Sequence, residues 1–428
     1  MSSPTRKLPA HKFQSQKDLL KLRRSALHSH FRKKVDELED TSNRPLLAAF
    51  LPKNFWPFAK GYLRYVFHRK HPFPVYPAQG ERGIYKLQAN DGGQEVKLSI
   101  AGDWGSGTAE AFKVAEAMSS FAPDYTIHLG DVYYVGDLDE VEENCLGEDV
   151  DEYIGVNWPR GRVGSFSLNG NHEMYGNGNA YFDTFLPALG IPSSQDKKQL
   201  TSFFCLENDY WRILGLDTGY NSTGLPILGQ IPLINQLPRV GPDCRLEKQM
   251  IEWLRDQVNP RSRRLATILL THHQAYSAFE EEYPLPARQL AGFFSGQEII
   301  WIWGHEHRMA VYQKFEDQNK ITAYARCLGN GGVPVMIREI KNRKAPLEYF
   351  DARPYANYED AKIGYNGFLN MRLQGKSARF DYRDLNNHSI LQEEFTIAND
   401  GTISQALIGV DPHLSKGDYA KVPTAVGA

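Results

Sequence analysis

Five apolar, strand-like runs in this chain are each followed at once by side chains that can bind a metal ion. In a sheet whose strands alternate with helices, the carboxyl ends of the strands meet at one edge, so side chains placed there come together. Adjacent glycines allow sharp turns at such an edge. The runs are 98–101 before Gly102-Asp103, 125–129 before Gly130-Asp131, 166–168 before Gly170-Asn171-His172, 268–270 before His272, and 299–303 before Gly304-His305-Glu306-His307.

The candidate ligands offer oxygen and imidazole nitrogen and no thiolate. This mixture suits iron, manganese, zinc or magnesium and argues against a structural cysteine–zinc site. His305 and His307 are two residues apart, so in an extended segment they project to the same side. Asn171 and His172 are adjacent and should diverge, so that one can bind metal while the other faces a substrate. The pattern predicts a site for two metal ions.

Two of the candidate ligands have a neighbour of the same type. Asp131 and Tyr134 share a face if a turn of helix follows the strand, but Tyr133 competes with Tyr134. His273 competes with His272 in the same way, although the apolar run ends directly before His272. The residues alone leave both alternatives open.

The motifs resemble those of the calcineurin-like metallophosphoesterase superfamily and, within it, the purple (tartrate-resistant) acid phosphatase branch. The common first motif of the superfamily is Gly-Asp-x-His, whereas this chain has Gly102-Asp103-Trp104-Gly105. The purple acid phosphatases make the same exchange and supply a tyrosine from the second motif, Gly-Asp-x-x-Tyr, which matches residues 130–134 here. The resemblance covers residues 96–335 and supports Tyr134 and His272 over their neighbours.

The resemblance implies a dinuclear metal site, with iron paired with iron, manganese or zinc. Asp131 would bridge the two ions, and His172 would stabilise the phosphoryl oxygens or protonate the leaving alkoxide. An ionised tyrosine on trivalent iron would give the protein a colour. The first ion would be bound by Asp103, Asp131, Tyr134 and His307, and the second by Asp131, Asn171, His272 and His305.

Two cations about 3.5 to 4 Å apart can bind a phosphoryl group and lower the pKa of a shared water to make hydroxide. We therefore expect hydrolysis of phosphoesters, with phosphomonoesters as the main substrates. A phosphodiesterase or nuclease on the same site, and a non-catalytic scaffold of the same fold, are the alternatives. The family places further substrate-facing histidines beyond the fourth motif, where residues 280–282 are three glutamates. These would repel a highly anionic substrate, so an acid optimum does not follow from the resemblance.

The fold that the resemblance implies is α/β, a four-layer α/β/β/α sandwich of two mixed sheets. We expect a basic N-terminal helical extension and Pro-rich linker over 1–80, the metallophosphoesterase domain over 81–399, and a mostly irregular C-terminal tail over 400–428. Local patterns predict a helix that starts near Ser106 or Thr108 and ends by Ala122-Pro123. They also predict a helix over 246–258, strands over 202–206 and 211–216, and further strands with alternating faces beyond residue 332.

The first 70 residues hold 16 Lys and Arg against 5 Asp and Glu, although the whole chain has a net charge of −2. An amphipathic basic helix and a basic aromatic stretch are expected there. They either pack on the body or bind an anionic membrane surface. The balanced overall charge gives no pull toward nucleic acid, so no specific nucleic-acid binding is expected.

Localisation is expected to be cytoplasmic, with peripheral membrane association as an option. No apolar run approaches the roughly 18 to 20 residues that span a bilayer. The first ten residues contain no apolar stretch of the kind found in signal peptides. The four cysteines, Cys145, Cys205, Cys244 and Cys327, have no paired spacing and fit free thiols in a reducing compartment.

Overall fold

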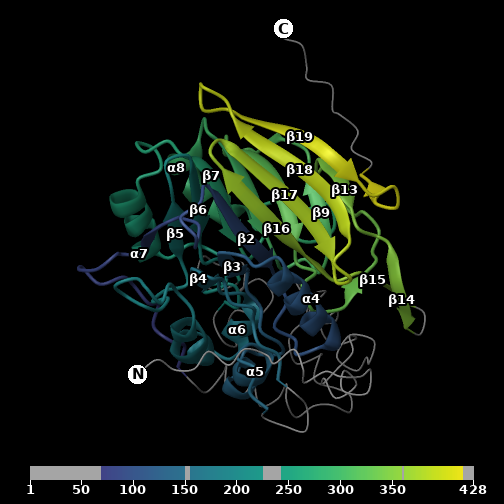
Figure 1. Ribbon diagram of the computed structural model, residues 1–428, viewed down its shortest axis with the longest axis horizontal. Coiled ribbons are helices and arrows are strands. Elements are labelled where there is room, and N and C mark those ends of the chain that lie inside the picture. The colour runs from purple at the N-terminus through teal and green to yellow at the C-terminus, as the bar shows by residue number, and fades with distance from the viewer. Residues whose placement is uncertain (1–68, 150–154, 225–241, 359–360, 418–428) are drawn as a thin grey trace.

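Two large mixed β-sheets form the centre of the protein (Figure 1). The computed structural model describes residues 69–149, 155–224, 242–358 and 361–417. The predicted mixed α/β class is confirmed. The N-terminal extension and its expected helix lie almost entirely outside the described residues, so the proposed domain boundary at residue 80 stays a prediction.

The first sheet contains ten strands within the described residues. Its central strands, from β6 through β7 and β8 to β11, run parallel, and antiparallel strands follow beyond β11. In sheet order they are β1 (Ile84–Lys86), β5 (Phe204–Glu207), β6 (Trp211–Gly215), β7 (Ala266–Thr271), β8 (Glu298–Trp303), β11 (Thr322–Leu328), β9 (Met309–Tyr312), β13 (Leu347–Phe350) and β20 (Ser415–Lys416), with β10 (Phe315–Glu316) paired to β11. The predicted strands over 202–206 and 211–216 are β5 and β6, with ends shifted by one or two residues.

The second sheet contains seven strands and joins the N-terminal and C-terminal parts of the domain. The strands β2, β3 and β4 are parallel, and β16 pairs antiparallel with β2. In order they are β19 (Ile403–Val410), β18 (Ser389–Ile397), β17 (Ser377–Asp384), β16 (Gly367–Gln374), β2 (Glu95–Ala101), β3 (Tyr125–His128) and β4 (Gly164–Ser167). A small third sheet is formed by β12 (Val335–Met336), β15 (Ala361–Gly364) and β14 (Pro354–Tyr358).

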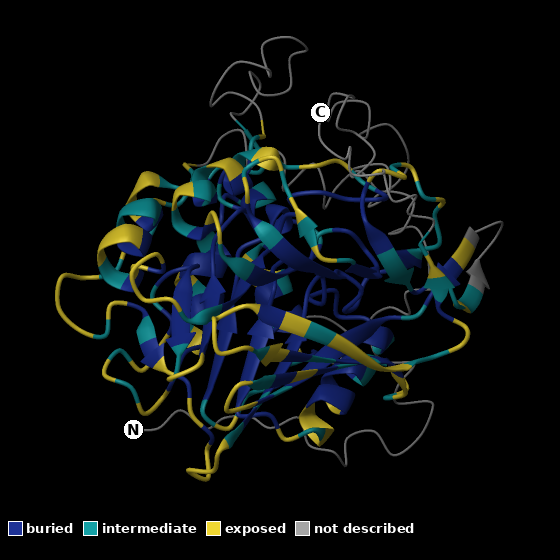
Figure 2. Cartoon of the chain, turned by 90° about the horizontal axis from the view of Figure 1, so that it is seen from above, coloured by how far each residue is buried: buried dark blue, intermediate teal, exposed yellow. Residues whose placement is uncertain are grey.

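A hydrophobic core lies between the two large sheets. Leu369, Met371 and Leu373 alternate along β16 and pack with Ile268 and Ile300 of the first sheet. This alternation was expected for strands beyond residue 332. Figure 2 shows the buried sheets inside a shell of partly exposed helices and loops. The burial of both faces of β7 and β8 explains why their sequences are continuously apolar.

Helices cover the outer faces of the sheets. The helices α7 (Lys248–Trp253) and α8 (Pro284–Phe294) share a second core with the first sheet, and α4 (Ala109–Ser120) contributes to a third core that also contains Ala101 and Phe368 of the second sheet. The predicted start of α4 is confirmed, because the Thr108 side chain accepts a hydrogen bond from the Ala111 N–H as its N-cap. The helix predicted over 246–258 is α7 continued by the π-helix η5 (Leu254–Val258).

The second sheet continues past residue 399, where an irregular tail was expected. The strand β19 pairs antiparallel with β18, and Ile403 is buried in the core between the sheets. The strand β20 then pairs with β13 in the first sheet. The expectation of an irregular tail is therefore wrong for these strands. Within the described ranges, no helix has the length and hydropathy needed to cross a membrane.

Candidate metal centre

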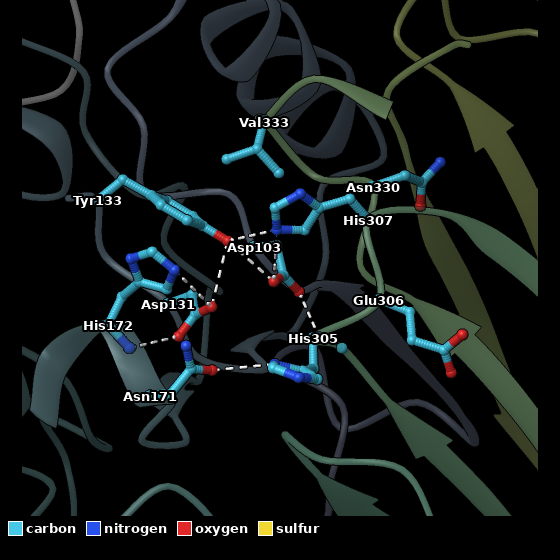
Figure 3. A network of polar contacts seen from close by, with 12 residues as sticks. Asp103, Asp131, Tyr133, Asn171, His172, His305, Glu306, His307, Asn330 and Val333 are labelled. Carbon is cyan, nitrogen blue, oxygen red and sulfur yellow. Dashed lines mark hydrogen bonds and ion pairs between the residues drawn. The ribbon is translucent and has the colours of Figure 1, made fainter. Parts of the chain in front are cut away.

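The predicted ligands come together where strands of both sheets end (Figure 3). Loops after β2 and β3 of the second sheet contact loops after β7 and β8 of the first. Within the second sheet the Asp103 N–H donates to the Gly130 carbonyl at 2.9 Å, and within the first the Gly304 N–H donates to the His272 carbonyl at 3.0 Å. Across the two sheets, the His305 N–H donates to Asp103 Oδ2 at 2.8 Å. Strand ends from distant parts of the sequence therefore come together, but they belong to two sheets and not to the edge of one.

Three of the candidate ligands have strained backbones. Asp103, Asp131 and His305 have φ angles of 57°, 76° and 63°. Residues other than glycine rarely adopt such angles, and those that do concentrate at functional sites. The surrounding bonds hold this conformation, since the His305 N–H donates to Asp103 Oδ2 at 2.8 Å.

Glycines allow the loops to approach each other closely. Gly130 has a φ of 104°, and a Cβ there would lie 2.8 Å from both the Gly170 nitrogen and His272 Nδ1. A Cβ on Gly170 would lie 2.0 Å from Asp131 Oδ1. Any side chain at these two positions would displace the candidate ligands, which explains the Gly-Asp and Gly-Asn-His patterns in the sequence.

Four side chains converge on the first metal position. The Tyr133 hydroxyl lies 3.0 Å from Asp103 Oδ1, 3.2 Å from Asp131 Oδ2 and 2.9 Å from His307 Nε2. A phenol has one proton and can donate to only one of the two carboxylates, whereas His307 Nε2 donates or accepts according to its tautomer. Three oxygen donors and one nitrogen donor directed at one point therefore fit a bound cation, and a hard ion in particular.

The tyrosine at this position is Tyr133, whereas the motif spacing favoured Tyr134. Val132 forms an isolated β-bridge with Gly105, and the next helix, α5 (Leu138–Asn144), begins only six residues after Val132. Asp131 has a positive φ, and residues 133–135 form a turn, so no helical turn follows Asp131 to place Tyr134 on its side. The Tyr134 side chain packs against the small apolar cluster of Tyr133 and Val333. The structure thus places the Tyr133 hydroxyl, and not that of Tyr134, among Asp103, Asp131 and His307.

Asn171, His272 and His305 form the second metal position. The Asn171 Oδ1 atom lies 3.1 Å from His272 Nε2 and 2.9 Å from His305 Nδ1. His272 Nδ1 contacts the Leu129 carbonyl at 2.9 Å. A carbonyl can only accept, so Nδ1 carries the proton and Nε2 keeps its lone pair for a metal ion.

Asp131 contacts both positions, as the predicted bridge should. Its Oδ2 atom lies 3.2 Å from the Tyr133 hydroxyl and 3.3 Å from His272 Nε2. Burial would raise the pKa of Asp131, but the neighbouring His272 and His172 imidazoles hold it well below its ordinary value. The carboxylate is thus ionised and available to two cations at neutral pH.

His172 lies beside the ligands and next to the bridging carboxylate. The His172 backbone N–H donates to Asp131 Oδ1 at 3.0 Å, and the ring nitrogen Nδ1 contacts the Tyr134 carbonyl at 2.7 Å. Since that carbonyl is an acceptor, the Nδ1 proton is fixed and Nε2 points toward Asp131 Oδ2, 3.9 Å away. In Figure 3 the ring lies between Asn171 and Tyr133 and faces the space between the two positions.

Two carboxylates that the motifs did not single out, the buried Glu173 and the partly buried Glu140, support the site. Glu173 Oε2 accepts from the Asp131 N–H at 3.2 Å and from the Gly170 N–H at 3.0 Å, so it joins the second and third motifs. Glu140 accepts from the backbone N–H groups of Tyr134 and Val135, at 2.6 and 2.9 Å. The Asp137-x-x-Glu140 capping box that begins α5 was the sequence signal for the second of these.

The glutamates at residues 280–282 carry less free negative charge than the sequence suggested. Glu280 Oε1 lies 2.8 Å from an Arg338 nitrogen and 3.3 Å from an Arg308 nitrogen. Glu282 accepts a hydrogen bond from Asn342. The next residue, Tyr283, contacts the site, because its hydroxyl lies 3.4 Å from His305 Nε2.

The sequence profile of the calcineurin-like phosphoesterase family matches residues 96–309. This match covers half of the chain, so the protein belongs to that family. With the convergent ligands described above, the family supports hydrolysis of phosphoesters at a metal site.

Several solved structures match this chain at low sequence identity and with TM-scores below 0.5. The purple acid phosphatase PPD1 of yellow lupin (Lupinus luteus) shows 13% identity and a TM-score of 0.44 over 74% of this chain and 55% of its own length. GAP50, the anchor in the inner membrane complex of Plasmodium, shows 14% identity and a TM-score of 0.44, covering 75% of this chain and 91% of its own. PhoD shows 10% identity and a TM-score of 0.45, covering 74% and 72%. This chain therefore spans about half the length of the lupin protein. No curated protein sequence matches significantly.

Proposed function

We propose that this protein hydrolyses phosphomonoesters with two metal ions held between the two sheets. The observation that carries the proposal is the Asp131 carboxylate, which contacts ligands of the first position through Tyr133 and of the second through His272. When bound, the two cations supply Lewis acidity and a nucleophilic hydroxide derived from water. The rest of the catalytic work falls to the residues of this chain.

His172 is the residue we assign to the substrate. Its Nδ1 proton is fixed on the Tyr134 carbonyl, so the orientation of the ring is set before substrate arrives. Its Nε2 faces the space between the metal positions, where it can donate to a phosphoryl oxygen or to the departing alkoxide. Asp131, by contrast, would hold both cations through its carboxylate.

We assign iron to the first position and iron, manganese or zinc to the second. The first position combines the Asp103 and Asp131 carboxylates with the Tyr133 phenol, which favours a hard trivalent ion. The second position is richer in imidazole. A tyrosinate–iron(III) pair at this position would give the protein the colour of the purple acid phosphatases, and that colour is directly measurable.

The experiment that tests the function compares p-nitrophenyl phosphate with bis-p-nitrophenyl phosphate as substrates. Protein loaded with iron and zinc, or with manganese, is assayed beside an Asp131→Asn variant, which keeps the shape of the side chain but removes the bridging charge. Turnover of the monoester that is lost in the variant supports the proposal. Activity confined to the diester would replace it with a phosphodiesterase or nuclease. Full metal occupancy without turnover of either substrate would replace it with a scaffold.

The basic N-terminal segment is assigned to an anionic membrane surface, on a cytoplasmic protein. Residues 1–70 carry 16 Lys and Arg against 5 Asp and Glu, which supports attraction to acidic lipids. All four cysteines are free and buried, which agrees with a reducing compartment. Sedimentation with phosphatidylserine vesicles but not with phosphatidylcholine vesicles is expected. Equal sedimentation with both would contradict the assignment.

A further inference from the structure

A third imidazole lies at the second metal position. One nitrogen each of His272, His273 and His305 lie within 4.8 Å of one another. The His273 ring centroid is 4.5 Å from that of His305 and 4.8 Å from that of His272. Three imidazoles this close, two of them buried, form a nitrogen-rich set that modest side-chain adjustment can bring onto one ion.

The orientation of His273 is set by Thr218. The Thr218 hydroxyl oxygen lies 2.9 Å from the His273 backbone nitrogen, from which it accepts a hydrogen bond, and 3.1 Å from His273 Nδ1. With Nδ1 engaged by this hydroxyl, Nε2 is the nitrogen available for an ion. His273 is 2% exposed, so it is held by protein and not by solvent. An oriented, buried imidazole beside two ligands is what a metal ligand requires.

We propose that His273 is a ligand of the second metal ion, in addition to His272. This inference rests on the dinuclear site of the proposed function and goes beyond it, because the family motif accounts for one histidine at this point of the chain. The sequence left open which of the two adjacent histidines is the ligand. In this proposal both His272 and His273 bind the second metal ion. The second position combines three imidazoles with the Asn171 amide and the Asp131 carboxylate, whereas the first combines three oxygen donors with one imidazole.

The consequence is metal selectivity. Imidazole favours zinc and iron(II), whereas carboxylate and amide oxygens suit manganese and magnesium. The second position should therefore prefer zinc to manganese, and His273 should provide much of that preference. The oxygen-rich first position serves as an internal reference, since it lacks this residue.

The test is displacement of manganese by zinc in the full-length protein without substrate. Protein loaded with two Mn²⁺ ions is titrated with Zn²⁺, and the released Mn²⁺ is followed by electron paramagnetic resonance. In the wild type, one Mn²⁺ should leave at low Zn²⁺ concentration and the other at higher concentration. In His273→Asn, the first release should need at least about tenfold more Zn²⁺, because mutating even an outer partner of a ligand changes affinity about 10- to 100-fold. His388→Asn is the matched control, since the His388 side chain is 74% exposed and lies outside the site.

A role limited to packing or to orienting neighbours gives a different result. It would weaken zinc and manganese equally, so the ratio of their affinities would not change in His273→Asn, and the inference would be overturned. Thr218→Val keeps the imidazole but removes its orienting hydroxyl, and should shift the same ratio by a smaller factor. The melting temperature of each metal-free variant shows whether it folds. Failure of the wild type to bind two ions would instead remove the proposed function itself.

Discussion

The hydroxyl of Tyr133 lies 2.9 Å from His307 Nε2, although the two residues are 174 positions apart in the chain. One follows β3 in the second sheet and the other follows β8 in the first, so the contact closes the first metal position across both sheets. Asp103 Oδ1 lies within 3.0 Å of the same hydroxyl. If the phenol loses its proton to a bound cation, the cation becomes the shared partner of the phenolate, the carboxylates and the imidazole that surround it.

This geometry predicts which tyrosine gives the protein its colour with iron. Iron-loaded wild type and Tyr134→Phe should both show a tyrosinate-to-iron(III) absorption band in the visible range. Tyr133→Phe should lose the band and at least about tenfold in kcat/KM, judging from the usual cost of altering groups around a metal. Visible spectra at equal iron content are the measurement. A band that persists in Tyr133→Phe and disappears in Tyr134→Phe would restore the assignment made from motif spacing.

Glu140 is predicted to position two parts of the site at once. Its carboxylate accepts from the Tyr134 N–H, while the carbonyl of the same tyrosine accepts from His172 Nδ1. Glu140→Ala leaves partly buried N–H groups without an acceptor, at about 1 kcal/mol each. We expect a lower urea midpoint, together with a lower kcat measured where both proteins are folded.

The matched control is Glu142→Ala. Glu142 is on the same helix, α5, two residues further along, and is only partly buried. The control should change the urea midpoint and kcat little. Equal effects of the two substitutions on kcat would show that the helix, and not the Glu140 carboxylate, supports the site.

A buried ion pair joins the two sheets away from the metal centre. Arg326 on β11 contacts both carboxylate oxygens of Glu393 on β18 at 2.6 Å, and both side chains are fully buried. Arg326→Met should destabilise the protein by about 3 to 5 kcal/mol, because Glu393 is left as an uncompensated buried charge. Replacing both residues by apolar ones should recover much of that loss. Urea unfolding is the measurement.

An exposed ion pair serves as the comparison. The Lys248 and Glu252 side chains are 85% and 41% exposed and lie one turn apart on α7. Lys248→Met should cost less than about 1 kcal/mol, as is usual for surface pairs. A double Arg326/Glu393 replacement as unstable as Arg326→Met alone would mean that Tyr382 and Gln405, which also donate to Glu393, depend on its charge.

The sequence alone located most of the metal site because ligand type and strand period are local properties. Gly102-Asp103 and Gly304-His305-Glu306-His307 each follow an apolar run, and the two sheets that carry these runs bring their strand ends together, as the His305 N–H donated to Asp103 Oδ2 shows. The choice between Tyr133 and Tyr134 was not local. It depends on the left-handed backbone at Asp131, the bridge between Val132 and Gly105 and the turn at residues 133–135, where a helical turn would have favoured Tyr134.

Two other features depended on distant partners in the same way. The charge of Glu280 is compensated by Arg308 and Arg338, which lie 28 and 58 residues further along the chain. The strand β19 has no alternating apolar pattern, because it is an edge strand with mostly exposed side chains that include Leu407 and Ile408. This strand is defined by its pairing with β18, and no local sequence pattern reveals that pairing.

Asp217 should make stability depend on pH in the direction opposite to most acidic residues. Burial raises its pKa to about 6 from an ordinary value of 3.8, despite hydrogen bonds from Ser202, the Tyr220 N–H and Asn169 and the nearby Lys70. Between about pH 4 and 6 the folded protein holds a proton that the unfolded chain has released. The contribution of Asp217 is therefore fully present below about pH 4 and is lost as the pH rises through about 6, by up to about 3 kcal/mol.

Asp217→Asn isolates this contribution, because the amide does not titrate. The difference in unfolding free energy between variant and wild type should move in favour of the variant from about pH 4 to about pH 7. Lys70 does not confuse the comparison, since burial lowers its pKa only to about 8 and it stays protonated throughout. Urea midpoints of the metal-free proteins at several pH values give the difference. A difference that stays constant across this range would mean that Asp217 is ionised in the folded protein already at about pH 4, stabilised by its three hydrogen-bond donors.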